Sequence, residues 1–176
     1  MRQSSQKSTE EPEYVNIYET LINALKLCFS RIKQIAKVSL NDLVFNLDLP
    51  KDGEIHMTKG RRQRLEQVWI VVISNALDEL VKIEDFEKRG LQIRIWEDER
   101  NINVSFEDNA GGIHPDILPQ IFDPFVSLKD SFGIGVGLNI AQRIIKNHNG
   151  EIYASNTNEG ALFKICLPKE SGDVSE

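Results

Sequence analysis

The chain has 176 residues, of which 27 are acidic and 21 basic, and its formal net charge at pH 7 is −6. We expect a chain of this length to form one domain that buries roughly 70% of its unfolded surface. The negative charge argues against a nucleic-acid-binding protein, and the sequence shows neither an apolar run that could span a bilayer nor a secretory signal.

The first third of the chain is predicted to hold one helix and two strands. Residues 1–13 are polar and unpatterned, and we expect them to be a disordered leader. Asn16 is a suitable N-cap for a helix whose apolar residues recur at helical spacing; they are Ile17, Leu21, Leu25, Cys28 and Ile32. Alternation of apolar and polar residues predicts a half-buried strand over residues 43–49, and a short strand is predicted near residues 54–57.

The rest of the chain is predicted to contain a long helix, four strands and a shorter helical segment over residues 138–145. The long helix runs from about Arg62 to Ile83 and has one apolar side. The strands cover residues 91–96, 102–107, 152–155 and 162–167, and residues 169–176 form a polar tail. Helices and antiparallel strands in this proportion favour an α+β fold over residues 14–168, a two-layer sandwich with helices on one face of a mixed sheet.

The two cysteines, Cys28 and Cys166, are far apart and lie in apolar periodic segments. This setting is typical of buried free thiols in a reducing compartment. We therefore expect neither a disulfide nor a metal site at these residues.

Two glycine clusters lie on either side of an amphipathic turn that carries Phe122 and Phe125. The first, residues 111–112, follows the predicted strand at 102–107, and the second, within residues 133–137, opens directly into a helical pattern. Backbone N–H groups of glycines at a helix start can close on an anion, and the helix dipole favours negative charge there. The second cluster therefore predicts a phosphate site.

The order of these motifs resembles the ATP-binding catalytic domain of sensor histidine kinases, within the ATPase superfamily shared with gyrase, Hsp90 and MutL. Residues 108–112 resemble the first glycine box of that family, residues 121–125 its phenylalanine box and residues 133–137 its second glycine box. The resemblance covers about residues 15–168 and implies a Bergerat-type ATP-binding fold.

Asn75 is a polar residue on a helical stretch that is otherwise almost continuously apolar. The segment resembles the asparagine box of histidine kinases, which implies that the Asn75 carboxamide oxygen binds Mg²⁺, a hard cation that prefers oxygen ligands. The alternative is a helix asparagine that is hydrogen-bonded to a neighbouring loop.

Asp108 ends a predicted strand at the edge of the expected pocket. An ionised carboxylate only accepts hydrogen bonds, so it suits the exocyclic amine of adenine and would repel the carbonyl oxygen of guanine. Gly112 would then let the backbone approach the base without a side chain in the way. The alternative is an aspartate that caps the turn at residues 109–110.

The resemblance also implies roles along the rest of the site. Lys129 would face the terminal phosphate as a point charge and act in catalysis together with Asn75. Lys82, two turns after Asn75, either reaches the phosphates or is a solvated lysine at the helix end. Further nucleotide-binding residues are implied in the glycine and phenylalanine boxes: Ala110, Ile113, Phe125, Gly133, Gly135, Val136, Gly137 and Leu138.

Three residues depart from the family pattern. Val71 stands where hydrolytic members carry a glutamate that activates water, and where many histidine kinases carry a second asparagine. Since valine can neither take a proton nor orient a water molecule, we expect slow ATP hydrolysis. Ala110 and Ala161 stand where the family often has glycine and threonine, and the missing threonine hydroxyl would remove a phosphate contact.

None of the three histidines fits the role of a phosphoacceptor. His56 lies in a predicted strand, His114 in the loop after Gly112 and His148 at a helix end, and we expect each to be a turn or surface histidine. The chain is therefore predicted to be a catalytic fragment whose acceptor histidine lies on a separate dimerisation domain.

We predict an ATP- and Mg²⁺-dependent protein-histidine kinase domain of a two-component system. Its partners would be ATP, the dimerisation domain of the same kinase (in cis or in trans) and, indirectly, a response regulator. Two alternatives stay open: a stand-alone serine kinase of a regulatory protein, and a degenerate nucleotide-binding scaffold. We expect a cytoplasmic location, as a separate protein or as the cytoplasmic part of a larger sensor, without membrane contact.

Overall fold

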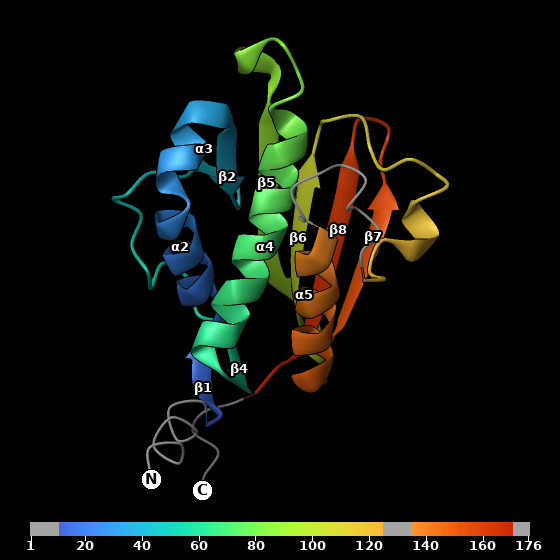
Figure 1. Cartoon of the computed structure of the whole chain (residues 1–176). Helices are drawn as coiled ribbons and strands as arrows, with labels where there is room; N and C mark the ends of the chain where they lie inside the picture. Colours follow the sequence, from blue (N-terminus) through green and yellow to red (C-terminus); the bar gives the residue numbers. More distant parts are fainter. Residues whose placement is uncertain (1–10, 125–134, 171–176) are drawn as a thin grey trace, which may run out of the picture.

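The computed structural model describes residues 11–124 and 135–170, and Figure 1 shows how the elements are arranged. The strands are β1 (Glu13–Asn16), β2 (Lys37–Leu40), β3 (Leu43–Val44), β4 (Met57–Gly60), β5 (Gly90–Glu97), β6 (Asn101–Asp108), β7 (Glu151–Asn156) and β8 (Ala161–Pro168). The α-helices are α2 (Ile17–Leu27), α3 (Phe29–Ile35), α4 (Arg62–Leu80) and α5 (Gly135–Asn147), and two short 3-10 helices are η1 (Phe86–Lys88) and η2 (Leu118–Gln120). The long helix and the four strands predicted after residue 61 are confirmed.

Six strands form one mixed sheet in the order β3-β2-β5-β6-β8-β7. Only β2 and β5 are parallel, and the other neighbouring strands of this sheet are antiparallel. At the β5–β6 turn, hydrogen bonds from the Asn103 side chain and from two backbone N–H groups lower the pKa of Asp98 to about 2. The register that follows from this turn pairs Leu91 with Asp108, which places Asp108 at the end of β6.

Helices α2, α3, α4 and α5 lie on one face of this sheet, as Figure 1 shows. Alternate residues of β8, namely Ala161, Phe163, Ile165 and Leu167, are buried, which is the pattern of a strand with one face on the core. Trp69 of α4 is fully buried, its indole N–H donates to Thr20 Oγ1 at 2.9 Å, and its ring centroid lies 5.8 Å from that of Phe106. The predicted two-layer α+β sandwich is confirmed.

The prediction of a strand over residues 43–49 is wrong. Only Leu43 and Val44 pair as β3, and both side chains are about half exposed. Phe45 is buried because its ring packs edge-on against Phe29, with the ring centroids 6.0 Å apart. The alternation of apolar residues in this stretch therefore does not mark one buried face of a sheet.

A separate two-stranded sheet forms where β1 pairs antiparallel with β4. Strand β4 begins at Met57, at the end of the stretch where a strand was predicted, and β1 has no counterpart among the predicted elements. Asn16 caps α2 as predicted, because its Oδ1 accepts hydrogen bonds from the N–H groups of Tyr18 and His56. The cap thus ties the start of α2 to the segment before β4.

His148 lies at the turn after α5, as predicted, but it is buried and not a surface residue. Its Nδ1–H donates to the carbonyl of Ile144 at 2.8 Å, and its Nε2 accepts from the N–H of Arg61 at 3.0 Å. Burial lowers the pKa of His148, so the neutral imidazole links the end of α5 to the start of α4.

Cys28 and Cys166 are both free, as predicted. Cys28 is buried between α2 and α3, whereas Cys166 is only half-buried and its thiol donates to Asn103 Oδ1 at 3.1 Å. Burial raises the pKa of both thiols, so they are mostly protonated at neutral pH and poor nucleophiles.

Candidate functional site

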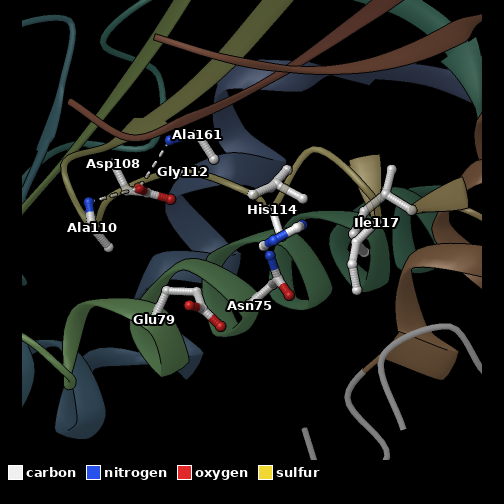
Figure 2. Close-up of a pocket in the computed structure, with 10 residues that line it drawn as sticks. Asn75, Glu79, Asp108, Ala110, Gly112, His114, Ile117 and Ala161 are labelled. Carbon is white, nitrogen blue, oxygen red and sulfur yellow. Dashed lines mark hydrogen bonds between the residues drawn. The ribbon is translucent and has the colours of Figure 1, made fainter. Parts of the chain in front are cut away.

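A cavity of about 260 Å³ lies between α4 and the loop that follows β6. Figure 2 shows how its residues are placed: Asn75 and Glu79 project from α4, and Asp108 and Ala110 lie across the cavity from them. The lining residues are Asn75, Glu79, Asp108, Ala110, Gly112, Ile113, His114, Ile117, Ile121 and Ala161. Five residues that the sequence assigns to nucleotide binding therefore meet in one cavity: Asn75, Asp108, Ala110, Gly112 and Ile113.

The two carboxylate oxygens of Asp108 differ in their hydrogen bonds. Its Oδ1 accepts hydrogen bonds from the N–H groups of Ala110 at 3.0 Å and Ala161 at 3.1 Å, which are the dashed lines in Figure 2. Among the described residues none donates to Oδ2. Burial raises the pKa of Asp108, although the two backbone hydrogen bonds oppose this shift. The bond from Ala110 is the turn cap considered as an alternative, and it leaves the second oxygen available to a ligand.

Gly160 lets the β7–β8 turn pack directly behind Asp108. A Cβ atom at residue 160 would lie 2.6 Å from Asp108 Oδ1 and still closer to the backbone carbonyl of Asp108. The turn itself is held by Thr157, whose Oγ1 accepts from the N–H of Gly160 at 2.9 Å. A side chain at residue 160 would therefore displace either the turn or the carboxylate.

Gly111 and Gly112 have φ angles of 91° and 85°, which residues with a side chain rarely adopt. A Cβ atom at Gly112 would lie 2.9 Å from Asn156 Oδ1. The Asn156 carboxamide is held in this position because it makes two hydrogen bonds with the backbone of Ile113. The backbone conformation and the close contact with Asn156 thus both require a glycine at residue 112. Neither requirement depends on a bound base.

Asn75 and Glu79 are one helical turn apart on α4 and line the same wall of the cavity. The Asn75 side chain makes no hydrogen bond with any described residue. The alternative interpretation, an asparagine that is hydrogen-bonded to a neighbouring loop, therefore has no support within the described residues. Glu79 forms an ion pair with Lys82 at 3.2 Å, and Lys82 itself is 62% exposed at the helix end. Asp78 pairs instead with Arg31 at 2.9 Å.

Residues 11–124 and 135–170 contain no group of three or more His, Cys, Asp and Glu side chains that could hold a metal ion. Asn75 and Glu79 nevertheless line one cavity, and their side chains carry oxygens, the ligand type that Mg²⁺ prefers. A Mg²⁺ ion here would therefore depend on these two side chains, on water and on the oxygens of a bound phosphate.

Helix α5 begins at Gly135, so Gly135, Val136 and Gly137 form its first turn. A Cβ atom at Gly137 would lie 3.0 Å from a methyl group of Val71, which shows that Val71 packs against the start of α5. The Leu138 side chain is fully buried in the core, so only its backbone could reach a ligand.

Three residues with implied roles, Phe125, Lys129 and Gly133, lie outside the described residues. Phe122, the other aromatic residue of that box, packs edge-on against Phe163 of β8, with the ring centroids 6.2 Å apart. Phe122 is thus partly buried and packs against the core.

Sequence reasoning did not assign Glu79, His114, Ile117 and Ile121 to the cavity. Glu79 follows Asn75 by four residues, a spacing that places both on one helix face and could have identified it. His114 was expected to be a turn or surface residue; it is exposed and in the loop, but it also lines the cavity, and its Nδ1 accepts from the N–H of Asp116 at 3.0 Å.

Residues 60–171, more than half of the chain, match the family described as "Histidine kinase-, DNA gyrase B-, and HSP90-like ATPase". The chain is 37% identical over 123 residues to the C4-dicarboxylate transport sensor protein DctB of Rhizobium meliloti (strain 1021), a match that covers 70% of this chain and 19% of DctB. It is 32% identical over 157 residues to Sporulation kinase A of Bacillus subtilis (strain 168), which covers 84% of this chain and 25% of that kinase.

The fold is similar to the catalytic domain of the histidine kinase ThkA in a nucleotide-free form, with a TM-score of 0.70 and 25% sequence identity. This match covers 90% of the chain and 98% of the ThkA domain. The chain thus spans about a fifth of DctB and a quarter of Sporulation kinase A, but matches nearly the whole of the ThkA catalytic domain.

Proposed function

Because the chain belongs to the family of histidine kinase-, DNA gyrase B- and HSP90-like ATPases, we propose that it binds Mg·ATP in the cavity beside α4 and transfers the γ-phosphoryl group to a histidine of a separate dimerisation domain. Its relatives are sensor kinases, and it has the fold of their ATP-binding catalytic domains. The observation that carries the proposal is that the second oxygen of Asp108 and the Asn75 amide, neither bonded to a described residue, border one cavity.

At the base end of the site, Asp108 Oδ2 would accept a hydrogen bond from the exocyclic amine of adenine. The two backbone N–H groups that hold Oδ1 also fix the plane of the carboxylate, so Oδ2 needs no reorientation when the base enters. Ala110 and Ile113 would supply the apolar surfaces beside the ring. Since an ionised carboxylate cannot donate, this arrangement favours adenine over guanine.

At the phosphate end, the oxygens of Asn75 and Glu79 would hold Mg²⁺, and bound there the ion would neutralise charge on the phosphates. Lys129 would face the terminal phosphate as a point charge. The N–H groups of Gly133, Gly135 and Gly137, at and before the start of α5, would bind phosphate oxygens where the helix dipole favours negative charge.

In the transfer step, the bond between the γ-phosphorus and the bridging oxygen breaks, a phosphorus–nitrogen bond to the acceptor imidazole forms, and ADP leaves. Such a reaction needs positioning and charge neutralisation more than covalent chemistry from the protein. Val71 offers no base that could activate water, and it packs against Gly137. We therefore expect ATP to be conserved for transfer and to be hydrolysed slowly.

The departures at Ala110 and Ala161 do not favour a degenerate scaffold. Both residues bind Asp108 through their backbone N–H groups, which any residue except proline provides. Ala110 adds only a methyl group where the family often has glycine. Ala161 lacks the hydroxyl of the threonine often found there, so we expect weaker phosphate binding and not its loss.

We further propose that the acceptor domain belongs to the same kinase, in cis or in trans, and that a response regulator receives the phosphoryl group afterwards. No helix within the described residues is long and apolar enough to cross a membrane. We propose that this domain works in the cytoplasm.

The test uses γ-labelled ATP, the chain alone, and the chain mixed with a folded dimeric domain that carries an acceptor histidine. Label should appear on the acceptor domain only, and it should be labile in acid and stable in base, as phosphohistidine is. Acid-stable label would point to a serine kinase, and a protein that binds no ATP would point to a scaffold. Rapid phosphate release by the chain alone would contradict the role given to Val71.

A further inference from the structure

We propose that Asn156, the last residue of β7, is a positioning residue that holds the loop of residues 110–114 against the nucleotide cavity. Asn156 does not line the cavity and so acts through the loop that does. The inference rests on the proposed ATP binding, because it assigns the loop to the nucleotide.

The loop needs hydrogen bonds from a neighbouring element because its own backbone can adopt many conformations. Residues 110–114 belong to no helix or strand, and Gly111 and Gly112 are free of the steric limits that a side chain imposes. Within the described part of the chain, the only side chain that hydrogen-bonds residues 111–113 is that of Asn156. The other hydrogen bond that holds this stretch within the described residues runs from the N–H of Gly111 to the carbonyl of Glu159 at 2.9 Å, and the Ile113 side chain packs against the core.

The chemistry of a carboxamide matches this task. Asn156 Oδ1 accepts from the N–H of Ile113 at 2.7 Å, and Asn156 Nδ2 donates to the carbonyl of Ile113 at 2.8 Å. One side chain thus satisfies both backbone groups of a residue that lines the cavity, as a neighbouring strand would. Aspartate lacks the donor, and an aliphatic side chain lacks both groups.

The same hairpin also holds the other end of the loop. Asn156 pairs with Ala161 across β7 and β8, and the N–H of Ala161 binds Asp108 Oδ1 at 3.1 Å. The hairpin therefore sets where Ile113 lies relative to the Asp108 carboxylate. If this spacing is lost, the two contacts to the base no longer reach it together.

The test compares Asn156→Ala with Asn158→Ala, a change of the same residue type two residues further along the β7–β8 hairpin. Asn158 is exposed and makes no hydrogen bond or ion pair with the described residues. We expect Asn156→Ala to bind Mg·ATP about tenfold more weakly in calorimetric titrations, the loss that corresponds to one or two exposed hydrogen bonds. Asn158→Ala should bind like the wild type. Hydrogen exchange at the Ile113 amide should become faster in Asn156→Ala only.

A merely structural role for Asn156 predicts a different pattern, in which the melting temperature falls and the ATP affinity of the folded protein stays the same. That result, or unchanged exchange at Ile113, would overturn the inference. If Asn156→Ala is too unstable to titrate, Asn156→Asp keeps the acceptor for the N–H of Ile113, and it must also lose ATP affinity for the inference to stand. Failure of the wild type to bind ATP would instead overturn the proposed function.

A double-mutant cycle with Gly112→Ala tests the contact between residue 112 and Asn156 independently. In the wild-type background the new methyl group would lie 2.9 Å from Asn156 Oδ1 and displace it. In the Asn156→Ala background that clash is absent and only the backbone strain remains. The loss of ATP affinity caused by Gly112→Ala should therefore be smaller in the second background. Additive losses would contradict the contact on which the inference depends.

Discussion

Replacing Asp108 by asparagine separates the two tasks of this carboxylate. The N–H groups of Ala110 and Ala161 both end on Oδ1, at 3.0 and 3.1 Å. Asparagine keeps one oxygen and gains an NH2 group, and its oxygen must stay where the two backbone donors are. The NH2 group then takes the place of Oδ2 and directs a donor at the adenine amine, which is itself a donor.

The fold should tolerate this change at neutral pH. Burial raises the pKa of Asp108 in the folded state, so the ionised carboxylate is less stable there than in the unfolded chain. The cost of burying this charge makes the wild-type protein lose stability as the pH rises above the unfolded pKa of about 3.9 and through the raised folded value. The neutral asparagine avoids it and keeps both backbone hydrogen bonds, so we expect a melting temperature at pH 7 no lower than that of the wild type.

The affinity for ATP should fall by about tenfold to a hundredfold. A hydrogen bond to a charged group contributes about 1.5–3 kcal/mol, which corresponds to this range of dissociation constants. GTP should lose nothing, because the guanine carbonyl oxygen now meets a donor. The preference for adenine over guanine should therefore shrink by at least the loss measured for ATP.

The assay is calorimetric titration of both variants and the wild type with Mg·ATP and Mg·GTP, together with thermal melts. Asp108→Ala is the control, because it removes Oδ1 and leaves two backbone N–H groups without a partner, at a cost of about 1–3 kcal/mol each. It should melt below Asp108→Asn. An Asp108→Asn protein that melts like the wild type and binds ATP equally well would refute the assignment of Oδ2 to the base.

Three further outcomes are expected. Asn75→Ala should sharply weaken Mg²⁺-dependent ATP binding and leave the melting temperature unchanged, because the Asn75 amide bonds to no described residue; equal Mg·ATP affinity in calorimetry would remove it from the site. Gly160→Ala should melt well below Gly90→Ala, since its Cβ would lie 2.6 Å from Asp108 Oδ1 whereas that of residue 90 has no neighbour nearer than 4.0 Å; similar melts would contradict the close packing. Burial lowers the pKa of His148, so the stability it contributes should be complete above the unfolded pKa of about 6.5 and be lost as the pH falls through the folded value; melts of wild type and His148→Gln between pH 7.5 and 5 should show a steeper loss for the wild type.

The sequence alone determined the elements whose signals are local. The apolar side of α4 repeats at helical spacing, and the strands β5, β7 and β8 alternate in burial, so each could be predicted from its own residues. The sequence of β6 also alternates between apolar and polar residues, although the structure buries both faces of this strand. The second glycine cluster predicted a phosphate site, because glycines at a helix start let backbone N–H groups bind an anion. The nucleotide site was implied by the resemblance of the ordered glycine and asparagine motifs to histidine kinase catalytic domains. The stretch at residues 43–49 shows the limit, since its alternation does not correspond to a long pairing strand.

Only the tertiary structure decided how the site is supported. Asp108 and Ala161 are separated by 53 residues, and Asn156 and Ile113 by 43, so no local pattern connects the hairpin to the loop that it holds. The sequence identified Asp108 as an acceptor but could not show that its two oxygens have different partners. The donors to Oδ1 are backbone N–H groups, which every residue except proline carries. For Val71, the sequence shows only that a base is missing at this residue. The structure adds that its side chain packs against Gly137. Backbone hydrogen bonds and close contacts between distant residues cannot be predicted from residue types, because they form only when the chain folds.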